Sequence, residues 1–291
     1  MFSGLYTAVV TPFKDGKLDE ASLRRILKHV LDSGSDGIVP SGTTGENPTL
    51  SEREKDILIS VTKEMCEEEG AHVIAGAGTN STYKTIKMIN EAEKFGIDGV
   101  LVITPYYNKP TQDGLLLHFK EIAAETNLPI MMYNVPSRTG VNMTADTVIE
   151  LSEEKNIVSL KEAGGDLIQF SSIVDGTKPG FTVLSGEDAL TLPSLAVGGE
   201  GVVSVASNVA PGFMSDMLDA WDDGNIEEAL TIHRKLLPLF KALFRETSPS
   251  PVKAAMEMMG LCSAEVRLPL APVREETKKA LEKALRDLEL L

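Results

Sequence analysis

One lysine, Lys161, stands where a short apolar run meets a glycine turn. Residues 156–165 read Asn-Ile-Val-Ser-Leu-Lys-Glu-Ala-Gly-Gly, which is typical of a buried strand and the turn after it. The lysine could simply extend its charge to solvent from the strand end. It could instead be a nucleophilic amine at the mouth of a pocket. That second role needs a low dielectric or a nearby positive charge, because an ordinary lysine titrates near ~10.4.

Other polar side chains follow other apolar runs. They are Thr43 and Thr44, Tyr106 and Tyr107, and Tyr133 and Arg138. Each has a structural alternative, since the threonines could mark only a tight turn, Tyr133 could be a core residue and Arg138 a surface ion-pairing residue. Gathered at one rim with an amine, these groups would suit carbonyl chemistry without a metal. The histidines (His29, His72, His118 and His233) fall on predicted helices or at a strand start, which supports neither a zinc site nor a histidine triad.

Eight apolar runs alternate with amphipathic helical patterns. The runs lie at residues 5–10, 36–39, 72–75, 98–103, 129–132, 156–161, 181–184 and 201–205. Runs that are apolar on both faces indicate a parallel sheet covered by helices, and eight such units predict an α/β fold of the (β/α)8 TIM barrel type. A doubly wound open sheet is the alternative, but no Gly-x-Gly-x-x-Gly follows the first run. In a barrel the polar residues named above would meet at the carboxyl ends of the strands.

Helix signals frame these runs and continue beyond them. Asp19, Thr144 and the pair Ser51 and Glu54 are candidate N-terminal caps. After about residue 207 the strand patterns cease, and helical patterns follow at residues 214–221, 226–244, 252–259 and 275–290. We therefore expect a barrel at residues 1–207 that carries the active site, and an appended C-terminal helical segment at residues 208–291 packed on it.

The composition limits the partners. A net charge of −15 argues against binding to nucleic acid, and no apolar run approaches the length of a membrane span. Cys66 and Cys262 have no partners at metal-ligand spacing and are expected to be reduced thiols. No signal peptide is expected, because residues 1–4 lead directly into the first run. These features predict a cytoplasmic protein; the acidic surplus could reflect a salty cytosol or only solubility.

Five motifs in order resemble one family. They are Gly-Thr-Thr-Gly-Glu at residues 42–46, Thr-Pro-Tyr-Tyr-Asn at 104–108, Tyr-Asn-Val-Pro-Ser-Arg-Thr-Gly at 133–140, Lys-Glu-Ala at 161–163 and Leu-Ser-Gly at 184–186. Together they closely resemble the dihydrodipicolinate synthase (4-hydroxy-tetrahydrodipicolinate synthase) family, class I pyruvate aldolases of the lysine (diaminopimelate) pathway. The resemblance runs along the whole chain, including Pro-Ser-Pro-Val-Lys at residues 249–253.

The resemblance implies a catalytic group of four residues. Lys161 would form a Schiff base with pyruvate, and Tyr133 would donate and accept the proton near the imine carbon. Thr43 would link Tyr133 to Tyr107 in a proton relay, with Tyr107 reaching in from a neighbouring subunit across a tight dimer interface. The resemblance therefore also implies a homotetramer built as a dimer of dimers.

Four more residues would bind the substrates. The Thr44 hydroxyl would hold the pyruvate carboxylate, with the Val203 carbonyl and Gly186 lining the pocket. Arg138 would bind the carboxylate of the second substrate, L-aspartate 4-semialdehyde, because a guanidinium fork matches a carboxylate. No cofactor and no metal would be needed.

Related aldolases of the same fold are alternatives. N-acetylneuraminate lyase and the 2-keto-3-deoxy sugar acid aldolases share the lysine, but Arg138 and Tyr107 favour the synthase, since the lyases usually lack that arginine. A non-catalytic binding member of the fold is disfavoured by retention of the complete relay.

Residues that bind inhibitory lysine in some family members differ in this chain. Asn47-Pro48 and Lys55 replace such residues, and Lys84 stands where a glutamate commonly contacts the inhibitor's amine, although Asn80 and Tyr106 remain. Because a cation facing an amine is unfavourable, we expect weak or absent inhibition by lysine.

Overall fold

The computed structural model describes residues 2–291. Within this part of the chain, eight parallel strands close into a barrel in the order β1-β10-β9-β8-β7-β6-β5-β4. Their bounds are β1 Gly4–Thr7, β4 Gly37–Ile38, β5 His72–Gly76, β6 Gly99–Ile103, β7 Ile130–Asn134, β8 Ile157–Glu162, β9 Thr182–Ser185 and β10 Gly201–Ser204. The predicted (β/α)8 barrel is confirmed, and closure rules out the open doubly wound sheet. The short apolar runs form strands because both faces are buried, as the fully buried strand β7 illustrates.

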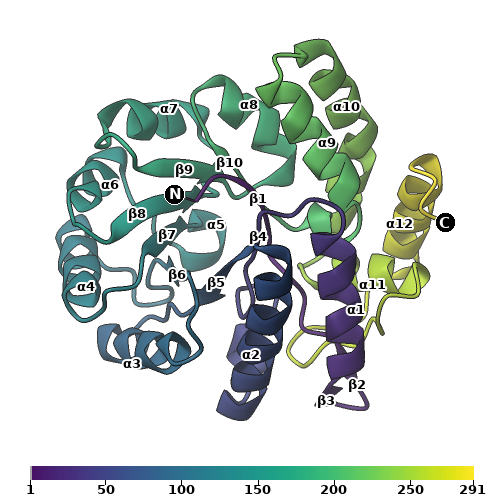
Figure 1. Ribbon diagram of the computed structural model, residues 1–291, viewed down its shortest axis with the longest axis horizontal. Helices are drawn as coiled ribbons and strands as arrows, with labels where there is room; N and C mark the ends of the chain where they lie inside the picture. The colour runs from purple at the N-terminus through teal and green to yellow at the C-terminus, as the bar shows by residue number, and fades with distance from the viewer. Residues whose placement is uncertain (1) are drawn as a thin grey trace. The chain divides into compact units, whose positions relative to one another are not determined.

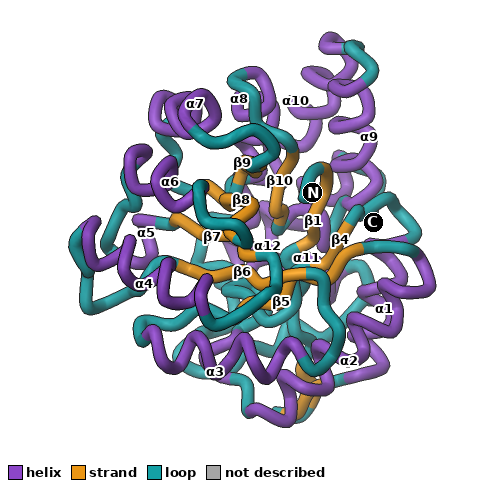
Figure 2. The backbone as a smooth tube through the Cα atoms, turned by 60° about the vertical axis from the view of Figure 1, so that its left-hand side comes forward, coloured by secondary structure: helices purple, strands orange, loops and turns teal. Residues whose placement is uncertain are grey.

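The chain divides into two compact units. The first unit comprises residues 2–4 and Val73–Val203. Its helices are α3 Thr82–Glu93, α4 Gln112–Ala124, α5 Pro136–Thr139, α6 Ala145–Ser152, α7 Leu167–Gly176 and α8 Thr191–Ala196, with a 3-10 turn η2 at Asp188–Leu190. Figure 1 shows α3, α4, α6 and α7 outside the strands of this unit, and Figure 2 shows strands β6 to β9 running side by side. Helix α4 packs on α6, and α6 packs on α7.

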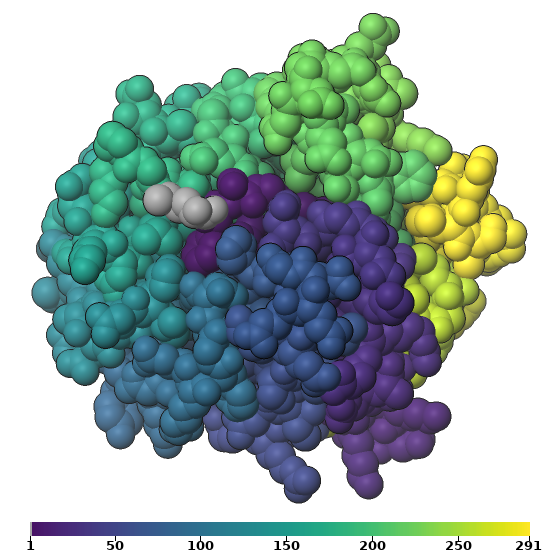
Figure 3. All heavy atoms as spheres, viewed as in Figure 1, coloured from purple at the N-terminus to yellow at the C-terminus, as the bar shows by residue number. Residues whose placement is uncertain are grey.

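The second unit comprises Leu5–His72 and Ser204–Leu291. Its helices are α1 Glu20–Leu31, α2 Glu52–Glu69, α9 Pro211–Asp222, α10 Ile226–Leu243, α11 Ser250–Met258 and α12 Glu275–Asp287, with 3-10 turns η1 at Asn47–Thr49 and η3 at Ala206–Asn208. Helix α9 packs on α10, and α12 packs on α10 and α11. Figure 3 shows α12, in yellow, beside the yellow-green residues that precede it. Residues 208–291 contain only helices as their regular elements, but they share this unit with the N-terminal residues, so a separate domain at 208–291 stays a prediction.

Local signals explain the helix starts. The Asp19 side chain accepts the Ser22 N–H at the start of α1, and Ser51 and Glu54 form the predicted capping box of α2. Thr144 occupies the cap position of α6 without making the capping bond that the sequence predicted. Its hydroxyl instead donates to the side-chain oxygen of Gln112 on α4 at 3.3 Å, which is a tertiary partner.

A hairpin that the sequence reading missed lies between β1 and α1. Strands β2 Phe13–Lys14 and β3 Lys17–Leu18 pair antiparallel across Asp15 and Gly16, whose φ angles are 53° and 76°. Two successive left-handed residues are the signature of a two-residue hairpin turn, and Asp-Gly is its usual sequence. The dipeptide was therefore a usable signal.

No helix among residues 2–291 combines the length and apolar character needed to cross a membrane.

Candidate active site

Lys161 is the last residue but one of β8, and it is almost completely buried. Its register partners on the neighbouring parallel strands are Tyr133 of β7 and Leu184 of β9. Only 5% of the lysine is exposed, and its Nζ lies 4.4 Å from the centroid of the Tyr133 ring. The amine therefore does not extend to solvent, and the first of the two interpretations of this lysine is wrong.

Burial changes the protonation of this amine. The pKa of Lys161 is lowered to about 8, chiefly because burial removes water from the charged form. The negative charge of Asp188 raises this pKa, and the positive charge of Arg138 lowers it further. About a tenth of the amine is then neutral at pH 7, whereas an ordinary lysine is almost entirely charged. This is the activation that a Schiff-base nucleophile requires.

Gly186 leaves space for the Lys161 side chain. A Cβ at this position would lie 2.7 Å from the Ala163 Cβ and 3.1 Å from the Lys161 Cε. The backbone of Gly186 is held there by its N–H, which donates to the Glu162 carbonyl at 2.7 Å. A larger residue would displace the lysine side chain, so the glycine is required by close approach. This places Gly186 beside the Lys161 side chain, and its part in a pyruvate pocket stays a prediction.

Arg138 and Val203 also lie in the first unit. Arg138 is exposed on the one-turn helix α5, near enough to Lys161 for its charge to lower the lysine pKa. Val203 is fully buried on β10, next to β9 in the sheet. Four predicted residues (Lys161, Tyr133, Arg138 and Gly186) are thus brought together around one amine.

Thr43 and Thr44 follow β4 in the second unit. Thr44 is buried and Thr43 is half-buried. The loop that carries them is fixed at Gly45, whose carbonyl accepts the Thr11 hydroxyl at 2.7 Å. A Cβ on Gly45 would lie 3.1 Å from the backbone nitrogen of Ser41, so this turn accepts only a glycine without adjustment. The loop that carries the threonines is thus anchored at Gly45, and their link to Tyr133 stays a prediction.

Tyr107 differs from the other predicted residues. It is 88% exposed, and its φ of 74° is unusual for a bulky residue. The next residue, Asn108, donates from its side chain to the Asn80 carbonyl at 3.0 Å, which ties this turn to the start of α3. The phenol of Tyr107 is therefore presented outward from its own chain by an ordered, strained turn.

One acidic residue that acts on the lysine, and its acidic neighbour in the chain, were missed in the sequence. Asp188 is 2% exposed at the start of η2, and its charge acts on Lys161. The pKa of the neighbouring Glu187 is raised, mainly by burial and then by Asp188. Their place directly after Gly186, at the end of a strand, was the available signal. No group of three or more possible metal ligands was found among residues 2–291, and independence from metals stays a prediction.

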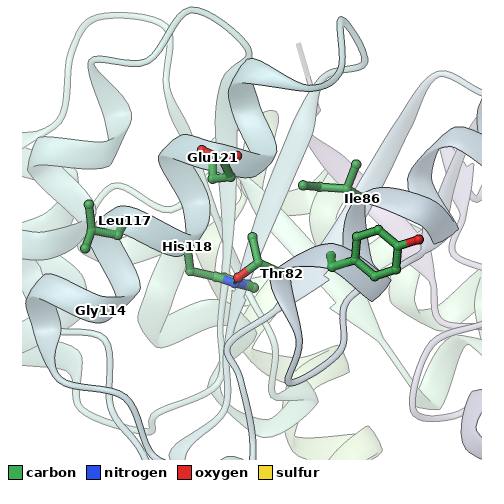
Figure 4. A pocket seen from close by; sticks show the side chains of 7 residues that line it. Thr82, Ile86, Gly114, Leu117, His118 and Glu121 are labelled. Atoms are coloured by element: carbon green, nitrogen blue, oxygen red, sulfur yellow. The ribbon is translucent and has the colours of Figure 1, made fainter.

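A separate pocket of about 540 Å³ lies between α3 and α4 (Figure 4). It is lined by Thr82, Tyr83, Ile86, Gly114, Leu117, His118 and Glu121. The Nδ1 atom of His118 forms a hydrogen bond of 2.9 Å with the Thr82 hydroxyl. Burial lowers the pKa of His118 to about 4, so the ring is neutral. None of the eight predicted site residues lines this pocket, which is therefore distinct from the surroundings of Lys161.

Comparisons with known proteins point to one family. The model of the Dihydrodipicolinate synthetase family matches residues 1–288. A 4-hydroxy-tetrahydrodipicolinate synthase from Thermotoga neapolitana is 50% identical over 295 residues, covering 100% of both chains. The solved structure of a monomeric dihydrodipicolinate synthase variant is 47% identical with a TM-score of 0.98, covering 100% of this chain and 98% of that one. The chloride-inhibited dihydrodipicolinate synthase from Acinetobacter baumannii, solved in complex with pyruvate, is 38% identical with a TM-score of 0.97 and covers 100% of both chains.

Proposed function

Because the chain belongs to the Dihydrodipicolinate synthetase family, we propose that it condenses pyruvate with L-aspartate 4-semialdehyde to give 4-hydroxy-tetrahydrodipicolinate, a step of lysine (diaminopimelate) biosynthesis. The observation that carries this proposal is the buried Lys161 amine with its pKa lowered to about 8. A neutral amine attacks a keto carbonyl, and a relative at 38% identity was solved with pyruvate.

The chemistry balances without an oxidant or reductant. The Lys161 amine attacks the keto carbon of pyruvate and water leaves, forming an iminium ion. Loss of a methyl proton gives an enamine, whose carbon attacks the aldehyde to form the new carbon–carbon bond. The amino group of the second substrate then displaces Lys161 and closes the ring. The iminium is the electron sink that makes the methyl proton removable.

We assign the proton steps to Tyr133, whose phenol comes from the strand next to the lysine. Thr43 would connect Tyr133 to Tyr107 in a relay that moves protons without bulk water. The Thr44 hydroxyl would bind the pyruvate carboxylate, with Gly186 and the Val203 carbonyl beside it.

Arg138 would bind the carboxylate of the aldehyde substrate. Its exposure on α5 leaves the guanidinium accessible, and its charge already acts on the Lys161 amine. This residue favours the synthase over N-acetylneuraminate lyase and the 2-keto-3-deoxy sugar acid aldolases, which are the second candidates because they share the pyruvate half of the reaction.

The outward phenol of Tyr107 supports assembly into a homotetramer in which Tyr107 enters the partner's site. An aromatic side chain that is 88% exposed on a strained turn has little to do within its own chain. One related structure is a monomeric variant, so the oligomeric state of this protein needs its own measurement, by sedimentation in solution. The cytoplasmic location and the absence of a cofactor stay predictions.

Borohydride reduction in the presence of pyruvate tests the proposal. We expect one covalent adduct per chain, mapped by peptide mass spectrometry to Lys161 and absent from a Lys161→Met variant. Lys253 is the matched internal control, because it is also a buried lysine but is ion-paired to Glu46. An adduct at Lys253, or at any residue other than Lys161, would overturn the assignment. Turnover of aspartate semialdehyde against sugar-acid substrates then separates the synthase from the other aldolases.

A further inference from the structure

Two buried polar side chains lie directly behind the catalytic pair. Asn134 and Glu162 are register partners on β7 and β8, one position after Tyr133 and Lys161. Successive side chains of a strand point to opposite faces, so Asn134 and Glu162 occupy the face away from the lysine. They are 0% and 5% exposed.

Hydrogen bonds join these two side chains closely. The Asn134 Nδ2 lies 3.2 Å and 2.9 Å from the two carboxylate oxygens of Glu162. The Gly164 N–H donates to the same carboxylate at 2.5 Å, and Gln169 of α7 donates at 3.4 Å. Every partner is a donor, which suits a carboxylate that only accepts. Burial nevertheless raises the pKa of Glu162 to about 7, while the hydrogen bonds oppose that rise.

Asn134 also closes the base of the loop that carries Arg138. Its Oδ1 accepts the Met143 N–H at 3.0 Å, and its Nδ2 donates to the Asn142 side chain at 2.8 Å. The chain between these contacts includes α5, a helix of only four residues that ends at Thr139 and is capped by Gly140. A single turn is not stable alone, because helix nucleation is unfavourable. The loop therefore depends on the contacts at its base.

We propose that Asn134 and Glu162 are positioning residues that fix the Arg138 loop to the carboxyl end of β8, so that the carboxylate of the second substrate is held at a set distance from the Lys161 amine. The inference rests on the proposed function, since it takes Arg138 as the group that binds this carboxylate. Neither residue touches substrate; both act through the position of Arg138. Misplacement of a substrate-binding group by about 1 Å can reduce a rate roughly 100-fold. The brace formed by Asn134 and Glu162, meaning their hydrogen-bonded link between the Arg138 loop and β8, therefore has a measurable effect.

The test compares Asn134→Ala with Asn156→Ala. Asn156 is a matched control, because its side chain is also an asparagine amide that joins distant parts of the chain. It donates to the backbone carbonyls of Ala123 and Thr126, but just before the amino end of β8. For Asn134→Ala we expect the KM for aspartate semialdehyde to rise about tenfold or more, with the rate of pyruvate trapping on Lys161 nearly unchanged. Asn156→Ala should change neither. Because Asn134 acts through Arg138, adding Asn134→Ala to Arg138→Leu should produce little further loss.

Hydrogen exchange gives a readout that needs no substrate. Backbone amides of residues 135–142 should exchange faster in Asn134→Ala and in Glu162→Gln, whose new amide group would face donors, but not in Asn156→Ala. Three results would overturn the proposed brace. They are an equal loss of pyruvate trapping and of aldehyde use in Asn134→Ala, fully additive effects of Asn134→Ala and Arg138→Leu, or unchanged hydrogen exchange of residues 135–142 in Asn134→Ala. Failure of the wild-type protein to trap pyruvate would instead overturn the proposed function, leaving the exchange result to decide the brace.

Discussion

Two buried lysines, one in each compact unit, lie over aromatic rings yet differ in what they can do. The Nζ of Lys161 is 4.4 Å from the ring centroid of Tyr133, and the Nζ of Lys253 is 4.2 Å from that of Phe13. Both are nearly or wholly inaccessible, at 5% and 0% exposure. Burial over a ring is therefore shared, and it cannot by itself explain a reactive amine.

Carboxylate pairing makes the difference. The Lys253 Nζ donates to Glu46 at 2.5 Å and to the Glu265 carbonyl at 2.8 Å, and Glu46 accepts the Arg267 N–H at 3.0 Å. Burial lowers the pKa of Lys253 as well, while the charge of Glu46 and its hydrogen bond raise it and hold the amine in an ion pair. The carboxylate that acts on Lys161 is Asp188, and its effect is outweighed by burial. Burial lowers the pKa of both lysines, so the direct ion pair with Glu46 is what separates Lys253 from Lys161.

The largest expected effect is the loss of stability when the ion-paired Lys253 is replaced. Lys253→Met leaves Glu46 buried without its cationic partner, so the free energy of unfolding should fall by about 3–5 kcal/mol in urea denaturation. Lys161→Met removes a poorly solvated amine and should change stability little or raise it. The double variant Lys253→Met/Glu46→Leu should recover part of the loss. Equal losses of unfolding free energy in Lys253→Met and Lys161→Met would contradict the proposed difference between the two lysines.

The pH dependence of adduct formation comes next in size. Only neutral Lys161 attacks pyruvate, and its pKa is about 8, so the trapping rate should rise about tenfold per pH unit below pH 8 and level off above it. Stopped-flow trapping from pH 6 to pH 10 measures this directly. A midpoint near the ordinary lysine value would show that burial does not activate the amine.

The smallest effect concerns Asp188. Asp188→Asn removes a charge that raises the pKa of Lys161, so the midpoint of the trapping profile should move below pH 8. Trapping at pH 7 should then increase several-fold, with a ceiling of about tenfold because roughly a tenth of the amine is already neutral. Slower trapping with an unchanged midpoint would mean that Asp188 serves the site in another way.

Much of the fold could be predicted from local patterns. Strand runs and helix periodicity placed most elements within a few residues, since burial on both faces of a strand and on one face of a helix leaves a mark in the sequence. The Asp15-Gly16 hairpin also had a local signal, which went unused. The absence of the predicted Thr144 capping bond could not be foreseen, because the Thr144 hydroxyl bonds to Gln112 on another helix.

The sequence by itself determined the family, the barrel and the lysine at the end of β8, because these depend on residue types in order and on their periodicity. Only the tertiary structure distinguished Lys161 from Lys253 and aligned Asn134 with Glu162. Lys253 meets Glu46 across 207 positions of the chain, and Asn134 meets Glu162 across 28. Desolvation and charge pairing are set by such distant neighbours, so the protonation of a lysine, and with it the chemistry, is decided by packing.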